Sequence, residues 1–112
     1  MIRFCRDGDA AAQGDMPKSG YAANSQAKVV AMAIRSELTG SRAFAAKYAN
    51  TCWSALAPDD GIKVGANYLP TPEKIASQDS FISQVSESAE LRQATFAESL
   101  AWYDAISADI FG

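Results

Sequence analysis

The clearest periodicity in the chain predicts a helix between residues 19 and 39. Ser19 stands at the N-cap position, and Gly40 follows Thr39 as a C-terminal cap. Small and apolar side chains recur at helical spacing between these caps. They are Ala23, Ala27, Val30, Ala31, Ile34 and Leu38. We therefore expect an amphipathic helix whose Ala-rich face packs closely against a sheet or another backbone.

Alternation of residue types predicts an antiparallel hairpin in the middle of the chain. Residues 48–56 favour an extended strand, and residues 62–69 alternate as a half-buried strand does. Between them, residues 58–61 read Pro-Asp-Asp-Gly, which predicts a type I turn ending in a left-handed Gly61. Pro70 ends the second strand, and a short third strand is expected near Ile75, within an otherwise irregular stretch.

The last segment, residues 86–110, predicts a long helix capped by Ser86 or Ser88. Its wide apolar face comprises Leu91, Phe96, Leu100, Tyr103, Ile106 and Ile110. Trp102 lies on the flank of that face, so the helix should bury against two surfaces, or against one surface and a partner. The elements together predict an α+β fold: a helix, an antiparallel hairpin or small three-stranded sheet, and a long C-terminal helix.

Composition narrows the function more than the fold. The chain has 112 residues, 48% of them hydrophobic, which suits one folded domain or a piece of a larger one. A formal charge of −3 without a basic cluster argues against nucleic acid as a partner. The longest apolar run, residues 29–34, is far short of the roughly 18 residues of a membrane span. With no histidine and two cysteines, imidazole catalysis and zinc sites are excluded, so we expect no metal.

Three features remain that could carry chemistry. Cys52 stands at a predicted strand start, where a buried, inert cysteine is the usual case and a redox thiol the functional alternative. Trp53 beside it could shield a flavin face. Gly8-Asp9 is a turn, or an acid that accepts hydrogen bonds from the hydroxyls of a sugar alcohol. The helix after residues 16–20, Met-Pro-Lys-Ser-Gly, points N–H groups at whatever lies before it.

Taken in order, these motifs resemble the C-terminal part of the flavoprotein subunit of flavocytochrome c sulfide dehydrogenase. The resemblance begins at Gly8-Asp9-Ala10 and continues through residues 16–26 and Asn50-Thr51-Cys52-Trp53-Ser54. It then includes residues 56–58 with 61–64, and ends with residues 102–112. It implies a flavoprotein with two dinucleotide-binding domains, of glutathione-reductase-like architecture, of which this chain is a fragment. Residues 1–40 are then the end of the FAD-binding domain, and residues 41–112 the C-terminal interface domain.

The resemblance also implies roles for single residues. Asp9, after Gly8, binds the ribityl chain of FAD, and Lys18, Ser19 and Gly20 open the helix that faces the flavin pyrimidine edge. Cys52 is one half of a redox-active disulfide through which sulfide is oxidised. Electrons pass to a cytochrome c subunit in the periplasm.

The resemblance stops before Gly8, where the polar Cys5-Arg6-Asp7 replaces an apolar strand end. The second cysteine of the disulfide and the glycine-rich FAD loop are then expected upstream, so that this chain alone should purify colourless. Two alternatives stay open: a fragment of a sulfide:quinone or NADH-type flavin reductase, and a non-catalytic interaction module.

Overall fold

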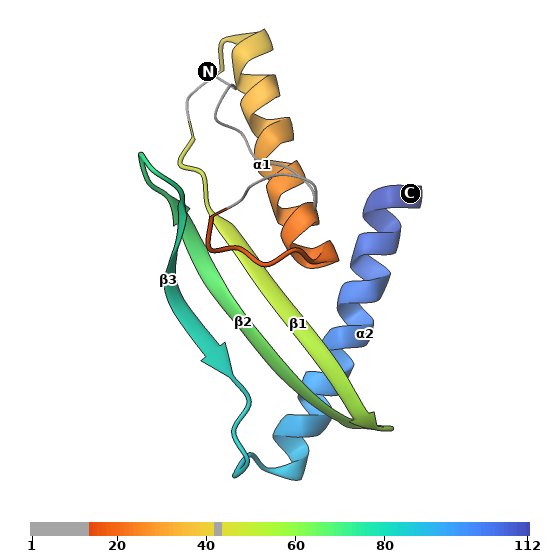
Figure 1. Cartoon of the computed structure of the whole chain (residues 1–112). Coiled ribbons are helices and arrows are strands. Elements are labelled where there is room, and N and C mark those ends of the chain that lie inside the picture. Colours follow the sequence, from red (N-terminus) through yellow and green to blue (C-terminus); the bar gives the residue numbers. More distant parts are fainter. Residues whose placement is uncertain (1–13, 42–43) are drawn as a thin grey trace. The chain divides into compact units, whose positions relative to one another are not determined.

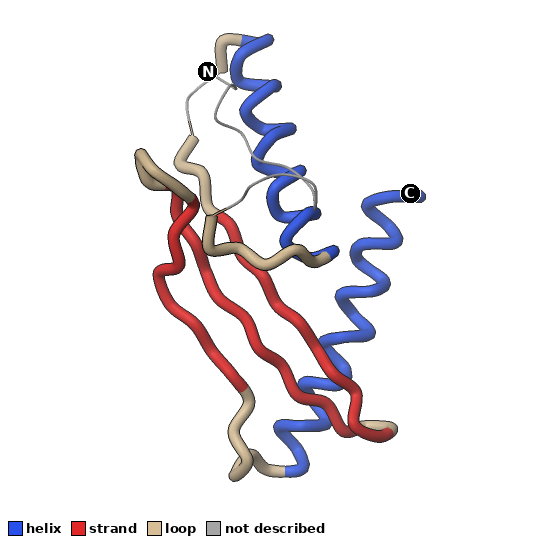
Figure 2. The backbone as a smooth tube through the Cα atoms, viewed as in Figure 1, coloured by secondary structure: helices blue, strands red, loops and turns tan. Residues whose placement is uncertain are grey.

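The computed structural model describes residues 14–41 and 44–112. In these ranges the chain forms a helix, three strands and a second helix (Figure 1). They are α1 (Gly20–Thr39), β1 (Tyr48–Ala57), β2 (Asp60–Pro70), β3 (Ile75–Ile82) and α2 (Ala89–Phe111). The strands form one antiparallel sheet in the order β1-β2-β3, in which consecutive strands are neighbours (Figure 2). The predicted α+β fold is confirmed, and β3 is longer than the short strand expected near Ile75.

Contacts divide the chain into two compact units, each with one helix and part of the sheet. The first unit comprises Met1–Thr51 and Ala66–Ser80, and therefore includes α1. The second comprises Cys52–Gly65 and Phe81–Gly112, and includes α2. No helix in the described ranges is long and apolar enough to cross a membrane.

Helix α1 begins and ends at the predicted caps. Ser19 has an extended backbone, and its side chain accepts a hydrogen bond from the N–H of Ala22 at 3.1 Å. Gly40 ends the helix in the left-handed conformation with φ 65°. The Ser19 side chain thereby satisfies a backbone N–H that the helix itself leaves without a partner.

The apolar face predicted for α1 is wrong by one residue. The helix buries Ala22, Gln26 and Val29, whereas Leu38 of the predicted stripe is 81% exposed. A pattern of apolar residues does not reveal this face, because the polar Gln26 lies at its centre. The Gln26 amide donates to the Met16 sulfur at 3.5 Å. The core of the first unit consists of Met16, Ala22, Val29, Tyr48, Ala66, Tyr68 and Ile75.

The β1–β2 hairpin forms as predicted, but its turn differs. The left-handed residue is Asp59, with φ 61°, and not Gly61. Proline favours the first central position of a two-residue turn and Asp tolerates a positive φ, so Pro58-Asp59 closes the turn. Gly61 instead lies in β2, where an added Cβ would come within 2.9 Å of the backbone N and Cα of Phe96. The close approach of α2 requires this glycine.

Helix α2 begins at the N-cap Ser88, whose side chain accepts the N–H of Leu91 at 3.2 Å. Its predicted apolar face is only partly correct. Phe96 and Ile106 are half-buried, but Leu91, Leu100, Tyr103 and Ile110 are exposed. The side that packs within the second unit is largely polar or aromatic. It includes Arg92, Thr95, Ser99 and Trp102.

Two ion pairs fasten α2 to the hairpin within the second unit. Arg92 Nε lies 2.6 Å from Asp60 Oδ1, and Lys63 Nζ lies 2.6 Å from Glu98 Oε2. These side chains are partly exposed, so each pair contributes little stability by itself. Their positions explain why an apolar pattern alone did not identify the packed side of α2.

Candidate functional site

The N-terminus of α1 brings together three residues that the sequence singled out. Ser19 is half-buried at the N-cap, and Lys18 and Gly20 are exposed on either side of it. A helix N-terminus carries a partial positive charge and backbone N–H groups, which favour an anionic group. The Lys18 ammonium adds to that charge. This end of α1 therefore favours a negatively charged group, and its expected contact with a flavin stays a prediction.

Asn50 of β1 contacts this end of α1 and is not among the site residues predicted from the sequence. Its Oδ1 accepts the hydroxyl proton of Ser19, and the residue is 4% exposed. A buried amide must find hydrogen-bond partners within the protein. The partner is 31 residues away in the sequence, so local pattern could not identify the pair.

Residues 14–16 hold the start of α1 beside strand β3. The Asp15 N–H donates to the Ile75 carbonyl at 2.9 Å, and Asp15 Oδ2 accepts the Ser77 N–H at 3.1 Å. Asp15 Oδ1 also lies 2.7 Å from Lys74 Nζ. Met16 then enters the core, 4% exposed. Gly14 also lies against the backbone of Ile75. Residues 14, 15 and 16 therefore all hold the loop before α1 in place.

Asp15 makes this attachment sensitive to acid. The hydrogen bond from the Lys74 ammonium, followed by that from the Ser77 N–H, lowers the pKa of Asp15 below its ordinary value of 3.8. A depressed pKa contributes stability that is present above the unfolded-state pKa and is lost as pH falls through the folded-state pKa. We expect the wild type to unfold at a higher temperature than Asp15→Asn at pH 7. This difference should shrink as the pH falls below 3.8 and vanish only below the lowered folded-state pKa. Thermal melts at a series of pH values on both sides of that pKa test this, and a constant difference would contradict it.

Cys52 lies in β1 with its side chain exposed. The burial that is usual for a cysteine at a strand start is therefore wrong for this residue. An accessible sulfur is what thiol–disulfide exchange requires, because the attacking nucleophile must reach it. The position of Cys52 is compatible with redox chemistry.

Trp53 follows Cys52 in the strand, so the two side chains leave opposite faces of β1. The Trp53 ring stacks on Trp102 of α2, with 5.8 Å between ring centroids and 28° between planes. Its Nε1 donates to Glu98 Oε2 at 3.4 Å. These contacts give Trp53 a packing role in the second unit, and its expected contact with a flavin stays a prediction.

The remaining predicted site residues, Gly8 and Asp9, lie outside the described ranges, as does Cys5. Their expected roles stay predictions.

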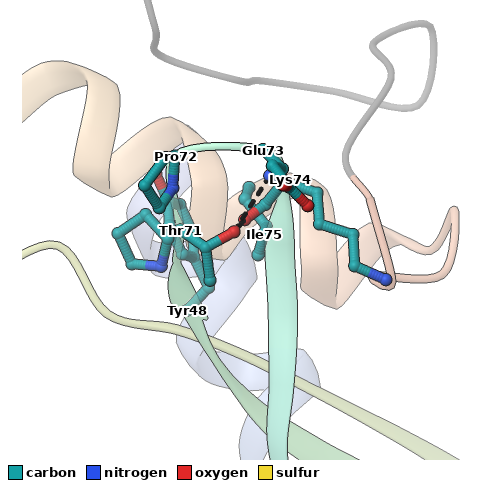
Figure 3. Close-up of a pocket in the computed structure, with 7 residues that line it drawn as sticks. Tyr48, Thr71, Pro72, Glu73, Lys74 and Ile75 are labelled. Carbon is teal, nitrogen blue, oxygen red and sulfur yellow. Dashed lines mark hydrogen bonds between the residues drawn. The ribbon is translucent and has the colours of Figure 1, made fainter.

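A cavity of about 380 Å³ opens at the β2–β3 connection in the first unit (Figure 3). A hydrogen bond from Thr71 Oγ1 to the Lys74 carbonyl, 2.6 Å long, closes the turn beside it. Among the described residues, none of those that line this cavity is a predicted site residue. The lining residues are Tyr48, Pro70, Thr71, Pro72, Glu73, Lys74 and Ile75.

The described residues form an α+β segment with an anion-favouring helix end and an accessible cysteine. Residues 44–111 match the family model described as flavocytochrome c sulphide dehydrogenase, flavin-binding. The match covers more than half of the chain, so the chain belongs to this family. It includes Cys52 and Trp53 and leaves α1, with Lys18, Ser19 and Gly20, outside. The family resemblance expected from the sequence is confirmed.

Proposed function

We propose that the chain is the C-terminal segment of an FAD-dependent sulfide dehydrogenase that passes electrons to a cytochrome c in the periplasm. Family membership supports flavin as the cofactor and sulfide as the substrate. The observation that carries the proposal is the exposed side chain of Cys52, which lies inside the matched residues. In this proposal residues 1–40 complete the FAD-binding domain and residues 41–112 form the interface domain.

Cys52 supplies one sulfur of a redox-active disulfide, the other coming from a cysteine in a preceding part of the complete protein. A hydrosulfide ion attacks the disulfide, so that one cysteine becomes a persulfide and the other leaves as a thiolate. A second hydrosulfide removes the outer sulfur as hydrodisulfide. Closing the disulfide again releases two electrons and one proton. The balance is two hydrosulfide ions to one hydrodisulfide, one proton and two electrons.

Bound flavin supplies an acceptor that takes two electrons and gives them up one at a time. The residues at the start of α1 favour the negative charge that accompanies its reduction, through the helix end and the Lys18 ammonium. Asp9 holds the ribityl hydroxyls, and Gly8 leaves room for the ligand beside the backbone. These assignments rest on the family resemblance and on the charge at the helix end.

Anaerobic addition of sulfide to the complete, FAD-loaded protein tests this function. We expect sulfide to bleach the flavin absorbance and added cytochrome c to be reduced, because the proposed electron path ends on haem. NADH in place of sulfide should leave the flavin oxidised. Bleaching by NADH, or transfer to a quinone but not to cytochrome c, would favour the reductase alternatives. No bleaching by either donor would favour the non-catalytic module.

A further inference from the structure

The N-cap of α1 depends on a second side chain, Asn50. The Ser19 hydroxyl gives its only proton to Asn50 Oδ1 and accepts the Ala22 N–H at 3.1 Å. Both contacts involve Ser19 Oγ. When its proton points at Asn50, a lone pair of the same oxygen is left to accept the Ala22 N–H, so the two hydrogen bonds are linked. Because Asn50 is 4% exposed, water competes poorly for its side-chain oxygen.

A second contact between β1 and α1 does not involve the cap. Ser25 Oγ accepts the N–H of Ala49 at 3.1 Å, more than one turn beyond Ser19. This bond also joins the start of β1 to α1. It therefore provides a matched control, because its loss should weaken the same packing without releasing the Ser19 hydroxyl.

We propose that Asn50 is a positioning residue, which fixes the first turn of α1 through Ser19 so that this helix end is held in place for the anionic edge of reduced flavin. The inference rests on the proposed function for its ligand. Asn50 precedes Cys52 by two residues in β1, so one short stretch of strand carries both the support of the helix end and the proposed redox sulfur.

The capping part is tested without flavin, by amide hydrogen exchange at Ala22 in the full chain. Loss of a Ser N-cap should speed local exchange about two- to thirtyfold. We expect this effect from Ser19→Ala and a comparable one from Asn50→Ala. The double variant should be no faster than Ser19→Ala alone, because both changes remove one linked arrangement. Ser25→Ala should leave exchange at Ala22 unchanged.

Asn50→Asp keeps an oxygen that accepts the Ser19 proton, and serves if Asn50→Ala does not fold. It should restore slow exchange at Ala22. Wild-type exchange in Asn50→Ala, or a double variant whose effect is the product of the two single effects, would overturn the inference. So would exchange in Asn50→Asp as fast as in Ser19→Ala.

The ligand part is tested in the complete, FAD-loaded protein by the ratio of reduced to oxidised flavin against a redox dye at fixed potential. Asn50→Asp places a carboxylate at the helix end and should lower this ratio about two- to fivefold although the cap is intact. Ser25→Ala should not change it. If sulfide reduces the wild-type flavin but the ratio in Asn50→Asp is that of the wild type, this inference fails and the proposed function stands. If sulfide does not reduce the wild-type flavin, the proposed function fails.

Discussion

Replacement of Cys52 by serine should lower sulfide oxidation by the complete FAD-loaded protein at least about a thousandfold, as the loss of an essential nucleophile does elsewhere. A serine oxygen cannot form the disulfide that the proposal requires. The flavin should remain bound, because the Cys52 side chain is exposed and serine is close to it in size. Steady-state rates with cytochrome c as acceptor, together with the flavin absorbance of the purified variant, measure both effects.

Ser54→Ala provides the matched control for Cys52→Ser. Ser54 is another exposed residue of β1, two positions along the strand, so its side chain leaves the same face as that of Cys52. We expect its turnover to equal that of the wild type. Sulfide oxidation that survives in Cys52→Ser would remove Cys52 from the reaction, and loss of flavin from both variants would indicate a structural effect of this part of β1.

Gly14→Ala should destabilise the chain by about 3 kcal/mol, because strain and a steric clash act together at this position. Gly14 has φ 67°, which costs an L-residue roughly 1–2 kcal/mol. An added Cβ would also lie 2.5 Å from the Ile75 carbonyl oxygen and 2.9 Å from its nitrogen. Both atoms belong to the backbone of β3, and overpacking of this kind costs about 1–3 kcal/mol. Denaturant melts of the full chain measure the loss.

Gly40→Ala separates the two causes. Gly40 has nearly the same φ, 65°, but an added Cβ would meet no atom within 4 Å. Its loss of stability should therefore be only about 1 kcal/mol, the conformational cost alone. Equal losses at Gly14 and Gly40 would show that the contact between Gly14 and Ile75 contributes nothing to holding the segment that leads into α1.

The sequence correctly predicted the elements whose ends are determined by residues close together in the chain. Helix α1 begins after Ser19 and ends before Gly40 as predicted, because an N-cap hydroxyl and a left-handed glycine act within one turn of the helix. The hairpin also formed where proline and aspartate favour a turn. The packed faces were predicted less well. Gln26 is buried with its amide donating to the Met16 sulfur, and Arg92 packs against the hairpin through its ion pair with Asp60. A pattern of hydrophobic residues reveals neither of these polar contacts.

The same limit applies to the site. Lys18, Ser19 and Gly20 were predicted together because they are adjacent in the sequence, and the structure places them at one helix end. Asn50 had no assigned role because its contact with Ser19 joins residues far apart in the chain. Cys52 and Trp53 were expected at the same site because they are neighbours in the sequence. Neighbouring residues in a strand, however, point to opposite faces of the sheet. Trp53 therefore reaches Trp102 from the face opposite to that of Cys52.

The proposed function requires that Cys52 is part of a disulfide in the resting, complete protein, and that sulfide opens this disulfide. Alkylation with iodoacetamide under denaturing conditions, followed by mass spectrometry of the Cys52 peptide, measures its state before and after anaerobic addition of sulfide. We expect no alkylation before sulfide. Afterwards we expect nearly complete alkylation, with or without one additional sulfur atom according to which half of the disulfide is attacked. Full alkylation of Cys52 before sulfide, unchanged afterwards, would contradict the proposed role of this residue.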